Sequence, residues 1–435
     1  MSGDAQIIKT NSPETDFLFK LFFDFVTHFI SFQYNILMKF LQTSDWHLGK
    51  TFHEVNLYED QQFFLDQIFD ELKKEKENGS AYDGFLVPGD IYDRPIPPSD
   101  AVTMLSSFLG KIHKEFPELE IFLLSGNHDS AERLSFLKGI LSELKIHIKT
   151  DVVSFMEPVL LEKGNEKCAV YQLPFLYSGA FFDESGNSIK KQDDLYKFAC
   201  EKIFQAHSQN CPDSSSVICA HLMTVKSIVS DSERSFVGTA EEVNASYFEC
   251  FDYSAVGHLH SYQTAGKKKN VVYSGAPLAY SFDDKGERFM LSVEVHKDEV
   301  PVIKSIPIKP LHKVVRLSGS FKDFYGTSEN KELIKKHEND FVEILITDSV
   351  VPEGAVSLLR TNFKNLLSFR RESKTELLNN SEILKRTKAV ESNNPEVIFE
   401  GFISELYGDE KNRIFETEKK EFLMIAKEND WEGGL

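Results

Sequence analysis

The feature that most constrains this chain is a set of five polar segments, each directly following an apolar run typical of a buried strand. The segments are Ser44-Asp45-Trp46-His47, Gly89-Asp90-Ile91-Tyr92-Asp93-Arg94, Gly126-Asn127-His128-Asp129, Ala220-His221 and Gly257-His258-Leu259-His260. Taken singly, each is usually turn chemistry or a structural histidine. Five such segments, each at the end of an apolar strand, are not expected by chance. Together they therefore predict one functional site.

From Lys39 onward, apolar runs typical of strands alternate with amphipathic helical patterns. This alternation predicts a β-α-β-α-β order of elements. The first expected strands are KFLQT, GFLVPGD and IFLLSG, and the expected helices cover about 59–77, 99–115 and 130–143. Later strands are CAVYQLP, SVICAH, YSAVGH, NVVYSG and RFMLSVEVH, with a helix over about 191–209. The strands are too uniformly apolar to be half-exposed, so the sheets should be buried between layers. The pattern favours an α/β fold built as a two-sheet sandwich flanked by helices.

The pattern changes near residue 308, where we place a domain boundary. Residues 297–310 alternate Val or Ile with Lys and Pro, as in an edge strand that leaves one domain for another. We expect a main domain over 38–307, a small α/β domain over 308–371 and a polar linker over 372–394.

Residues 395–435 predict a pair of amphipathic helices. Two interpretations are equally open: the helices dock a partner, or they fold back on their own domain.

Residues 1–37 form an extension that we expect to lie outside the fold. Its stretch 17–37 is strongly apolar, but Lys20, Asp24 and His28 interrupt it, and no basic region or cleavage site frames it as a signal peptide. A membrane span is therefore not expected. The stretch is either an upstream-start artefact or an added helix.

The charge balance excludes bulk attraction to nucleic acid or to anionic membranes, because 49 Lys and Arg face 68 Asp and Glu, a net charge of -19. A polyanionic substrate would therefore need a local patch of positive charge on the protein. Two basic clusters are either solvated or in contact with DNA phosphates: Lys267-Lys268-Lys269, and Lys364, Arg370, Arg371 and Lys374. The five cysteines are odd in number and never spaced C-x-x-C, which indicates a reducing, cytoplasmic compartment.

The donors in the five segments suit a divalent metal. Asp, His and Asn without cysteine are typical ligands of Mn²⁺, Fe²⁺ or Zn²⁺. Residues two apart in an extended chain project the same way, so Asp45 with His47, and His258 with His260, can face one centre. Asp129 or Ser130 can instead cap the helix that follows.

The order D-x-H, G-D-x-x-D-R, G-N-H-D, H and G-H-x-H resembles the calcineurin-like metallophosphoesterases. The opening MKFLQTSDWHLGK, the GDIYDR segment and the domain order resemble more narrowly the SbcD family of bacterial nuclease subunits. The resemblance covers about residues 38–430. It implies the metallophosphoesterase sandwich, a small α/β capping domain and partner-docking C-terminal helices.

The resemblance also implies two divalent ions, expected to be Mn²⁺. One would be held by Asp45, His47, Asp90 and His260, and the other by Asp90, Asn127, His221 and His258, so that Asp90 bridges them. Such pairs clamp a phosphodiester and supply a hydroxide that attacks phosphorus in line.

The same resemblance makes His128 catalytic rather than a ligand, stabilising the transition state or protonating the leaving oxygen. Asp93 would orient His128, although some nuclease relatives carry histidine at that position. Arg94 is expected to contact phosphate or to pair with a nearby acid; both interpretations stay open.

The implied function is a two-metal DNA nuclease in DNA repair, recombination and replication. It would act as an ATP-dependent exonuclease on double-stranded ends and as an endonuclease on single strands and hairpins, with an SbcC-like coiled-coil ATPase in a two-plus-two assembly. A homodimer is also compatible with the sequence. The alternatives are a small-molecule phosphodiesterase or phosphomonoesterase, and a non-catalytic scaffold, which the complete set of ligand side chains disfavours.

Overall fold

A computed structural model describes most of the chain between residues 37 and 371. The described ranges are 37–136, 138–225, 242–284, 286–325, 330–348, 350–371, 419–420 and 422–424. The extension 1–36, the linker 372–394 and nearly all of the segment 395–435 lie outside these ranges. The predictions made for those parts therefore stay predictions.

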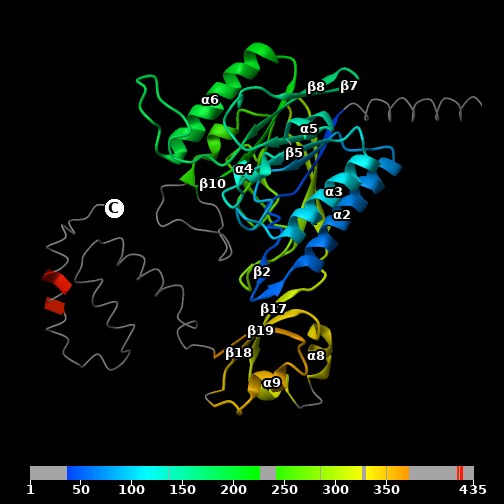
Figure 1. The fold of residues 1–435 in the computed structure, drawn as a ribbon, viewed down its shortest axis with the longest axis vertical. Coiled ribbons are helices and arrows are strands. Elements are labelled where there is room, and N and C mark those ends of the chain that lie inside the picture. The colour runs from blue at the N-terminus through cyan, green and yellow to red at the C-terminus, as the bar shows by residue number, and fades with distance from the viewer. Residues whose placement is uncertain are drawn as a thin grey trace, which may run out of the picture. The chain divides into compact units, whose positions relative to one another are not determined.

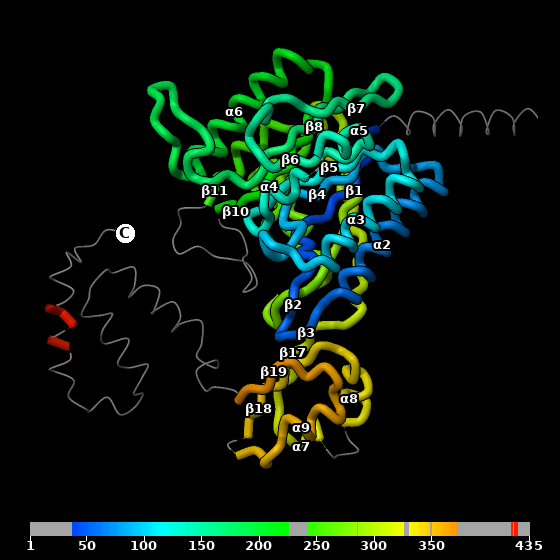
Figure 2. The backbone as a smooth tube through the Cα atoms, viewed as in Figure 1, coloured from blue at the N-terminus to red at the C-terminus, as the bar shows by residue number. Residues whose placement is uncertain are grey.

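The first of two six-stranded sheets has the order β16-β15-β1-β4-β5-β6. Its strands are β1 (Met38–Gln42), β4 (Gly84–Val87), β5 (Glu120–Leu124), β6 (Ile146–Lys149), β15 (Arg288–Val295) and β16 (Val302–Ile308). Strands β1, β4, β5 and β6 are parallel and lie side by side in Figure 2, whereas β15 and β16 are antiparallel additions. β16 lies at the sheet edge, which confirms the predicted edge strand.

The second sheet has the order β13-β14-β12-β9-β8-β7. Its strands are β7 (Val159–Lys163), β8 (Glu166–Leu173), β9 (Ser215–His221), β12 (Tyr253–Gly257), β13 (Gln263–Ala265) and β14 (Val271–Tyr273). The four central strands are parallel and the two outer ones antiparallel. Each sheet therefore gathers the carboxyl ends of several parallel strands at one edge.

The two sheets pack face to face through a shared apolar core. Phe40 and Phe122 from the first sheet lie in one buried cluster with Val170 and Val217 from the second. On the outer faces, α2 (Tyr58–Glu77) and α3 (Ser99–Glu115) pack against the first sheet, and α6 (Gln192–Asn210) packs against the second (Figure 1). The predicted helix-flanked sandwich is confirmed. Its strands have continuous apolar sequences because both faces of each sheet are buried.

The helix predicted over 130–143 is wrong as a single element. The structure has two short helices, α4 (Ala131–Leu134) and α5 (Lys138–Glu143). Leu134 is buried, but Phe136 and Ile140 are 73% and 62% exposed. A continuous helix here would gain little from packing, and short helices depend on packing for their stability.

The chain divides into two compact units. Among the described residues, the larger unit contains those up to 316 together with 333–343 and 363–368, and the smaller contains those in 317–332, in 344–362 and from 369 onward. After β16 come β17 (Val314–Gly319), α7 (Phe321–Phe324), α8 (Lys331–His337), β18 (Phe341–Ile346), α9 (Ala355–Leu359) and β19 (Asn365–Arg371). The three strands form one sheet in the order β17-β18-β19. Strands and helices alternate here, as in the α/β pattern expected over 308–371, and the predicted boundary near residue 308 stays a prediction.

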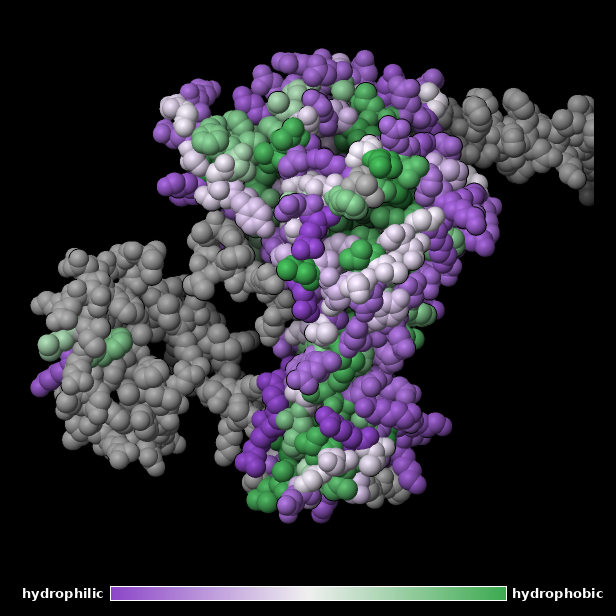
Figure 3. Space-filling view, in the orientation of Figure 1, coloured by the Kyte–Doolittle hydropathy of each residue, from purple (hydrophilic) through white to green (hydrophobic). Residues whose placement is uncertain are grey.

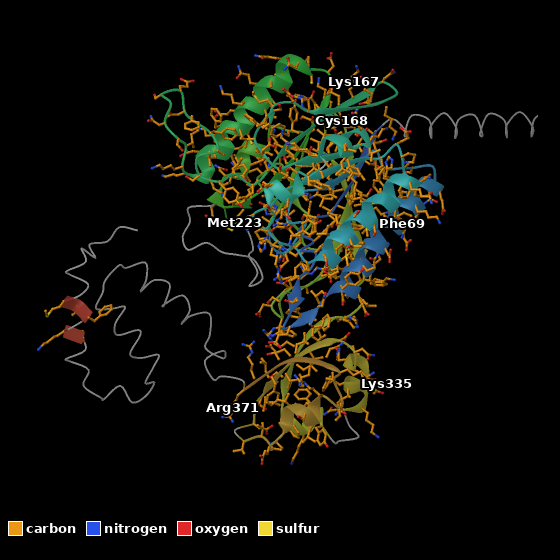
Figure 4. All side chains as sticks on the ribbon, in the orientation of Figure 1. Phe69, Lys167, Cys168, Met223, Lys335 and Arg371 are labelled. Atoms are coloured by element: carbon orange, nitrogen blue, oxygen red, sulfur yellow. The ribbon has the colours of Figure 1, made fainter. Side chains whose placement is uncertain are left out.

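The described surface is mixed in character. The face seen in Figure 3 is mostly hydrophilic, with hydrophobic side chains in separate patches. Cys168, labelled in Figure 4, is a buried free thiol of β8, and the other four cysteines are also free. Among the described residues, no helix combines the length and the apolar character that crossing a membrane requires.

Candidate metal centre

The structure brings all five polar segments together at the carboxyl ends of parallel strands from both sheets. Asp45 and His47 follow β1, Asp90 follows β4, and Asn127 and His128 follow β5 of the first sheet. His221 ends β9, and His258 and His260 follow β12 of the second sheet. The two sheets therefore supply opposite walls of one buried cluster.

Three of these residues form the first group. The possible ligand atoms of Asp45, His47 and His260 all lie within 4.8 Å of one another. The Nε2 atoms of His47 and His260 face each other at 3.1 Å. His47 Nε2 is also 3.8 Å from Asp90 Oδ2.

The second group centres on Asn127. Its Oδ1 lies 2.9 Å from His221 Nε2 and 3.1 Å from His258 Nδ1. His221 Nε2 is in turn 3.5 Å from Asp90 Oδ2. The Asp90 carboxylate thus lies beside both groups, in the position that a bridging ligand would need.

The chemistry of this donor set fits divalent cations. Burial and the nearby Asp90 carboxylate raise the pKa of Asp45 to about 8. Burial also holds the pKa values of His47 and His260 well below their ordinary range, so both imidazoles stay neutral. Two buried carboxylates, and imidazole nitrogens that face one another, form a set that a cation between them would satisfy.

The backbone at these residues is unusual. Asp45, His47, Asp90 and His258 all have positive φ angles, of 55°, 45°, 49° and 108°. Non-glycine residues rarely adopt this region, and each such residue costs on the order of 1–3 kcal/mol. The fold therefore holds these four side chains in place against local preference.

Two glycines allow the strand ends to approach. Gly89 has a φ of 93°, and a Cβ there would lie 2.2 Å from His221 Nδ1. A Cβ at Gly126 would lie 2.1 Å from Asp90 Oδ1 and 2.5 Å from the Asp90 backbone nitrogen. Neither site has room for a side chain.

The Gly126→Ala variant is expected to displace Asp90, lower the free energy of unfolding by about 1–3 kcal/mol and weaken metal binding, because the added methyl group overpacks the cluster. Thermal unfolding and Mn²⁺ titration measure both effects. The matched control is Gly110→Ala in α3, where a Cβ meets no atom within 4 Å and should stabilise the helix by about 0.5–1 kcal/mol. Equal behaviour of the two variants would contradict the expectation.

His128 lies at the edge of the cluster and is held at two points. Its backbone N–H donates to Asp90 Oδ1 (3.0 Å), and its Nδ1–H donates to the main-chain carbonyl of Asp93 (2.8 Å). Its ring lies edge-on to that of His47, with centroids 4.7 Å apart. Since Nδ1 is bonded, Nε2 is the ring atom available for chemistry.

Asp93 contacts His128 through a different atom than the sequence suggested. The expected contact was through its carboxylate, but that group accepts a hydrogen bond from Lys50 Nζ at 2.7 Å and lies 3.7 Å from His47 Nδ1. The main-chain carbonyl takes the expected place. The prediction that Asp93 orients His128 therefore rests on backbone geometry.

Asp129 organises the site, a role that sequence analysis missed. Its buried carboxylate accepts hydrogen bonds from the backbone N–H groups of Ile91, Tyr92 and Gly126. It thus ties the loop after β4 to the loop after β5. The cap of α4 is Ser130, whose side chain accepts from Arg133 N, and no sequence signal separated the two roles in advance.

Arg94 and the two basic clusters are the candidate residues for contact with phosphate. Arg94 is exposed. The Lys267-Lys268-Lys269 cluster occupies the turn between β13 and β14, where two of its backbone N–H groups bind the Glu249 carboxylate. Lys364 forms an ion pair with Glu338 (2.8 Å), Arg371 (labelled in Figure 4) ends β19, and Lys374 lies outside the described residues. DNA contact by these groups stays a prediction.

Metal affinity is expected to rise with pH. Burial and Asp90 raise the pKa of Asp45 to about 8, and the Asp90 carboxylate, against the effect of burial, raises the pKa of His221 to about 9. Both groups hold protons at pH 7 and must lose them to bind a cation, so affinity should increase about tenfold per pH unit for each proton released. Calorimetric titration with Mn²⁺ at pH 6, 7 and 8 tests this, and an affinity independent of pH would contradict it.

The chain matches a family model and is similar to a solved structure. A family model for the calcineurin-like phosphoesterases matches residues 38–262, a range that contains all five polar segments. A crystal structure described as a putative 5'-nucleotidase from Staphylococcus aureus, in complex with alpha-ketoglutarate, is similar at 13% sequence identity and a TM-score of 0.34. That match covers 74% of this chain, which spans 62% of the other chain.

Proposed function

The chain belongs to the calcineurin-like phosphoesterase family, whose members hydrolyse phosphate esters with divalent metals, and we propose that its substrate is DNA. The observation that carries the hydrolytic part is the position of Asp90 between the two groups of donors. Asp90 Oδ2 faces both groups, and a carboxylate oxygen has lone pairs for two cations. We therefore propose two metal ions, held by Asp45, His47, Asp90 and His260 and by Asp90, Asn127, His221 and His258.

When bound, such ions stabilise the charge that develops on phosphate oxygens and lower the pKa of bound water. The protein residues contribute position and proton transfer. The backbone N–H of His258 donates to Asp45 Oδ1 (2.9 Å), and Ser44 Oγ donates to Asp45 Oδ2 (2.6 Å), so both oxygens of that carboxylate are held in place. Orientation of this kind lets a reactant meet the donors without reorganisation.

His128 is the proposed proton donor. The Asp93 carbonyl fixes its tautomer with the proton on Nδ1, and protonation at Nε2 would make the ring a donor toward the leaving oxygen. General acid catalysis of this kind contributes about 10²–10⁴-fold to the rate.

The choice of DNA rests on the resemblance to the SbcD family and on local charge. An acidic chain needs a local basic surface for a polyanion, and the Lys267-Lys268-Lys269 turn and the residues Lys364, Arg370, Arg371 and Lys374 are candidates. Contacts there would go to phosphates, with weak sequence preference. We propose Mn²⁺ as the metal, exonuclease action on double-stranded ends and endonuclease action on single strands and hairpins.

An SbcC-like coiled-coil ATPase is the proposed partner, in a cytoplasmic two-plus-two assembly that acts in DNA repair and recombination. The expected docking segment is 395–435. A phosphodiesterase or phosphomonoesterase for small molecules would not need that segment, so deleting residues 395–428 should leave such an enzyme unchanged. A nuclease that acts with a partner should instead lose assembly with it.

The deciding experiment mixes the purified protein and Mn²⁺ with a labelled DNA hairpin and, separately, with bis(p-nitrophenyl) phosphate. The His128→Ala variant, purified identically, controls for contaminating nuclease. Cleavage of the hairpin by the wild type and not by the variant is the expected result. Cleavage of the small diester alone would overturn the nuclease assignment and favour the small-molecule enzyme.

A further inference from the structure

Buried hydroxyl groups contact the main chain beside the proposed ligands, and they do so separately for the two groups of donors. Tyr280 donates its hydroxyl to the carbonyl of Trp46, the residue between Asp45 and His47, at 2.5 Å. Tyr196 donates its hydroxyl to the carbonyl of His221 itself, at 2.6 Å. Both tyrosines are buried, at 4% and 0% exposure.

Tyr280 also packs against two imidazole rings. Its ring lies edge-on to that of His47, with centroids 5.3 Å apart, and to that of His260, with centroids 5.7 Å apart. Lys50 Nζ lies 5.3 Å from the centroid of the same ring. The tyrosine ring therefore packs edge-on against both imidazoles and supports their orientation.

A second contact anchors His260 from the same side. Arg288 donates from one guanidinium nitrogen to the His260 carbonyl at 2.6 Å, and another of its nitrogens lies 3.6 Å from Asp284 Oδ2. That Asp284 oxygen accepts the backbone N–H of Tyr280 at 2.8 Å. Tyr280, Asp284 and Arg288 are therefore one connected brace behind the donors Asp45, His47 and His260.

The other group has its own supports. Tyr196 accepts the backbone N–H of Leu176 (3.1 Å) while it donates to His221, and His221 Nδ1–H donates to the carbonyl of Pro88 (2.9 Å). These bonds hold His221 with Nε2 facing Asn127 and Asp90. The hydrogen bonds of the Tyr196 hydroxyl thus go to residues outside the brace around Tyr280.

We propose that Tyr280 and Tyr196 are positioning residues, each setting the metal affinity of one half of the centre: Tyr280 that of the Asp45, His47 and His260 half, and Tyr196 that of the His221 half. The proposal rests on the two-metal centre proposed above. Groups that orient metal ligands typically change metal affinity by about 10–100-fold when removed. The two halves should therefore respond to different mutations.

The test compares Tyr280→Phe with Tyr196→Phe, changes that remove one hydroxyl and keep the ring. Crystals of each variant and of the wild type are soaked at a Mn²⁺ concentration that just fills both wild-type positions, and manganese anomalous maps report each occupancy. Tyr280→Phe should lose the ion beside His47 and His260 and keep the one beside His221 and His258. Tyr196→Phe should show the reverse.

Two further variants keep the test decisive. Arg288→Met removes the other anchor of His260 and should empty the same position as Tyr280→Phe, which covers the case in which Tyr280→Phe does not fold. Tyr171→Phe loses an equally buried hydroxyl, bonded to His207 Nδ1 at 3.1 Å, and should keep both ions. In solution, excess Mn²⁺ should restore kcat to the positioning variants.

Full occupancy of both positions in Tyr280→Phe and Tyr196→Phe would overturn the assignment of these tyrosines and leave the two-metal centre standing. Equal loss of both ions in each variant would also overturn it, because it would show a general loosening of the cluster. Wild-type crystals that bind no manganese would overturn the centre and the tyrosine roles together.

Discussion

The Asp90→Asn variant is expected to lose hydrolysis of phosphodiesters by more than about 10³-fold in kcat/KM. Loss of one donor to a developing oxyanion already costs about 10²–10³-fold. Asp90 does more, because its Oδ2 lies beside both His47 and His221 while its Oδ1 holds the backbone of His128. An amide offers one neutral oxygen in place of a negatively charged carboxylate, so it holds two cations much more weakly.

The same variant should bind at most one manganese ion, measured by calorimetry and by metal analysis after gel filtration. The metal-free fold should lose some stability at pH 7, because the uncharged amide gives up the attraction to His221 by which the Asp90 carboxylate, against the effect of burial, raises the pKa of that imidazole to about 9. Asp66→Asn is the matched control, since that carboxylate is on the surface and pairs with Lys111. Two bound ions together with wild-type activity in Asp90→Asn would rule out the bridging role.

The His128→Gln variant is expected to lower kcat on DNA by about 10²–10⁴-fold while manganese binding stays unchanged. The DNA leaving group is an alkoxide that needs a proton, and glutamine cannot supply one. Bis(p-nitrophenyl) phosphate releases a stable phenolate that departs without protonation. The variant should therefore lose much less activity on this diester than on DNA.

Two other outcomes would assign His128 differently. An equal loss on both substrates would show that the ring stabilises charge on the phosphate and does not deliver a proton. A loss of bound manganese would make His128 a ligand, an arrangement that its grouping with His47 and Asp90 within 4.8 Å allows. Lys50→Met is the variant to compare with His128→Gln. It removes the hydrogen bond from Lys50 to the Asp93 carboxylate and leaves the hydrogen bond from His128 to the Asp93 main-chain carbonyl in place.

Most of the fold was predictable because its strands are short apolar runs with polar ends. β1, β4, β5, β9 and β12 all follow the expected pattern, and since the carboxyl ends of parallel strands converge, the five segments were expected to meet. The helix over 130–143 failed because a helical pattern does not reveal whether its apolar side finds a surface to cover. Phe136 and Ile140 found none.

The supports of the site were less predictable than the donors. A motif identifies Asp93 by its side chain, whereas the structure uses its carbonyl, and which atom faces His128 depends on backbone angles that residue types do not determine. Asp129 and Tyr280 act on residues that are either in another loop or more than 200 positions away in the chain. Such long-range hydrogen bonds leave no local periodicity to detect.

The left-handed backbone at Asp45, His47, Asp90 and His258 bears on any attempt to engineer this protein. A library screened for heat resistance alone should enrich for replacements that relax these four positions, since stabilising changes commonly accumulate where activity had required an unfavourable conformation. The most heat-resistant variants from such a screen would then be inactive. Selection for robustness in this scaffold therefore has to be coupled to turnover in every round.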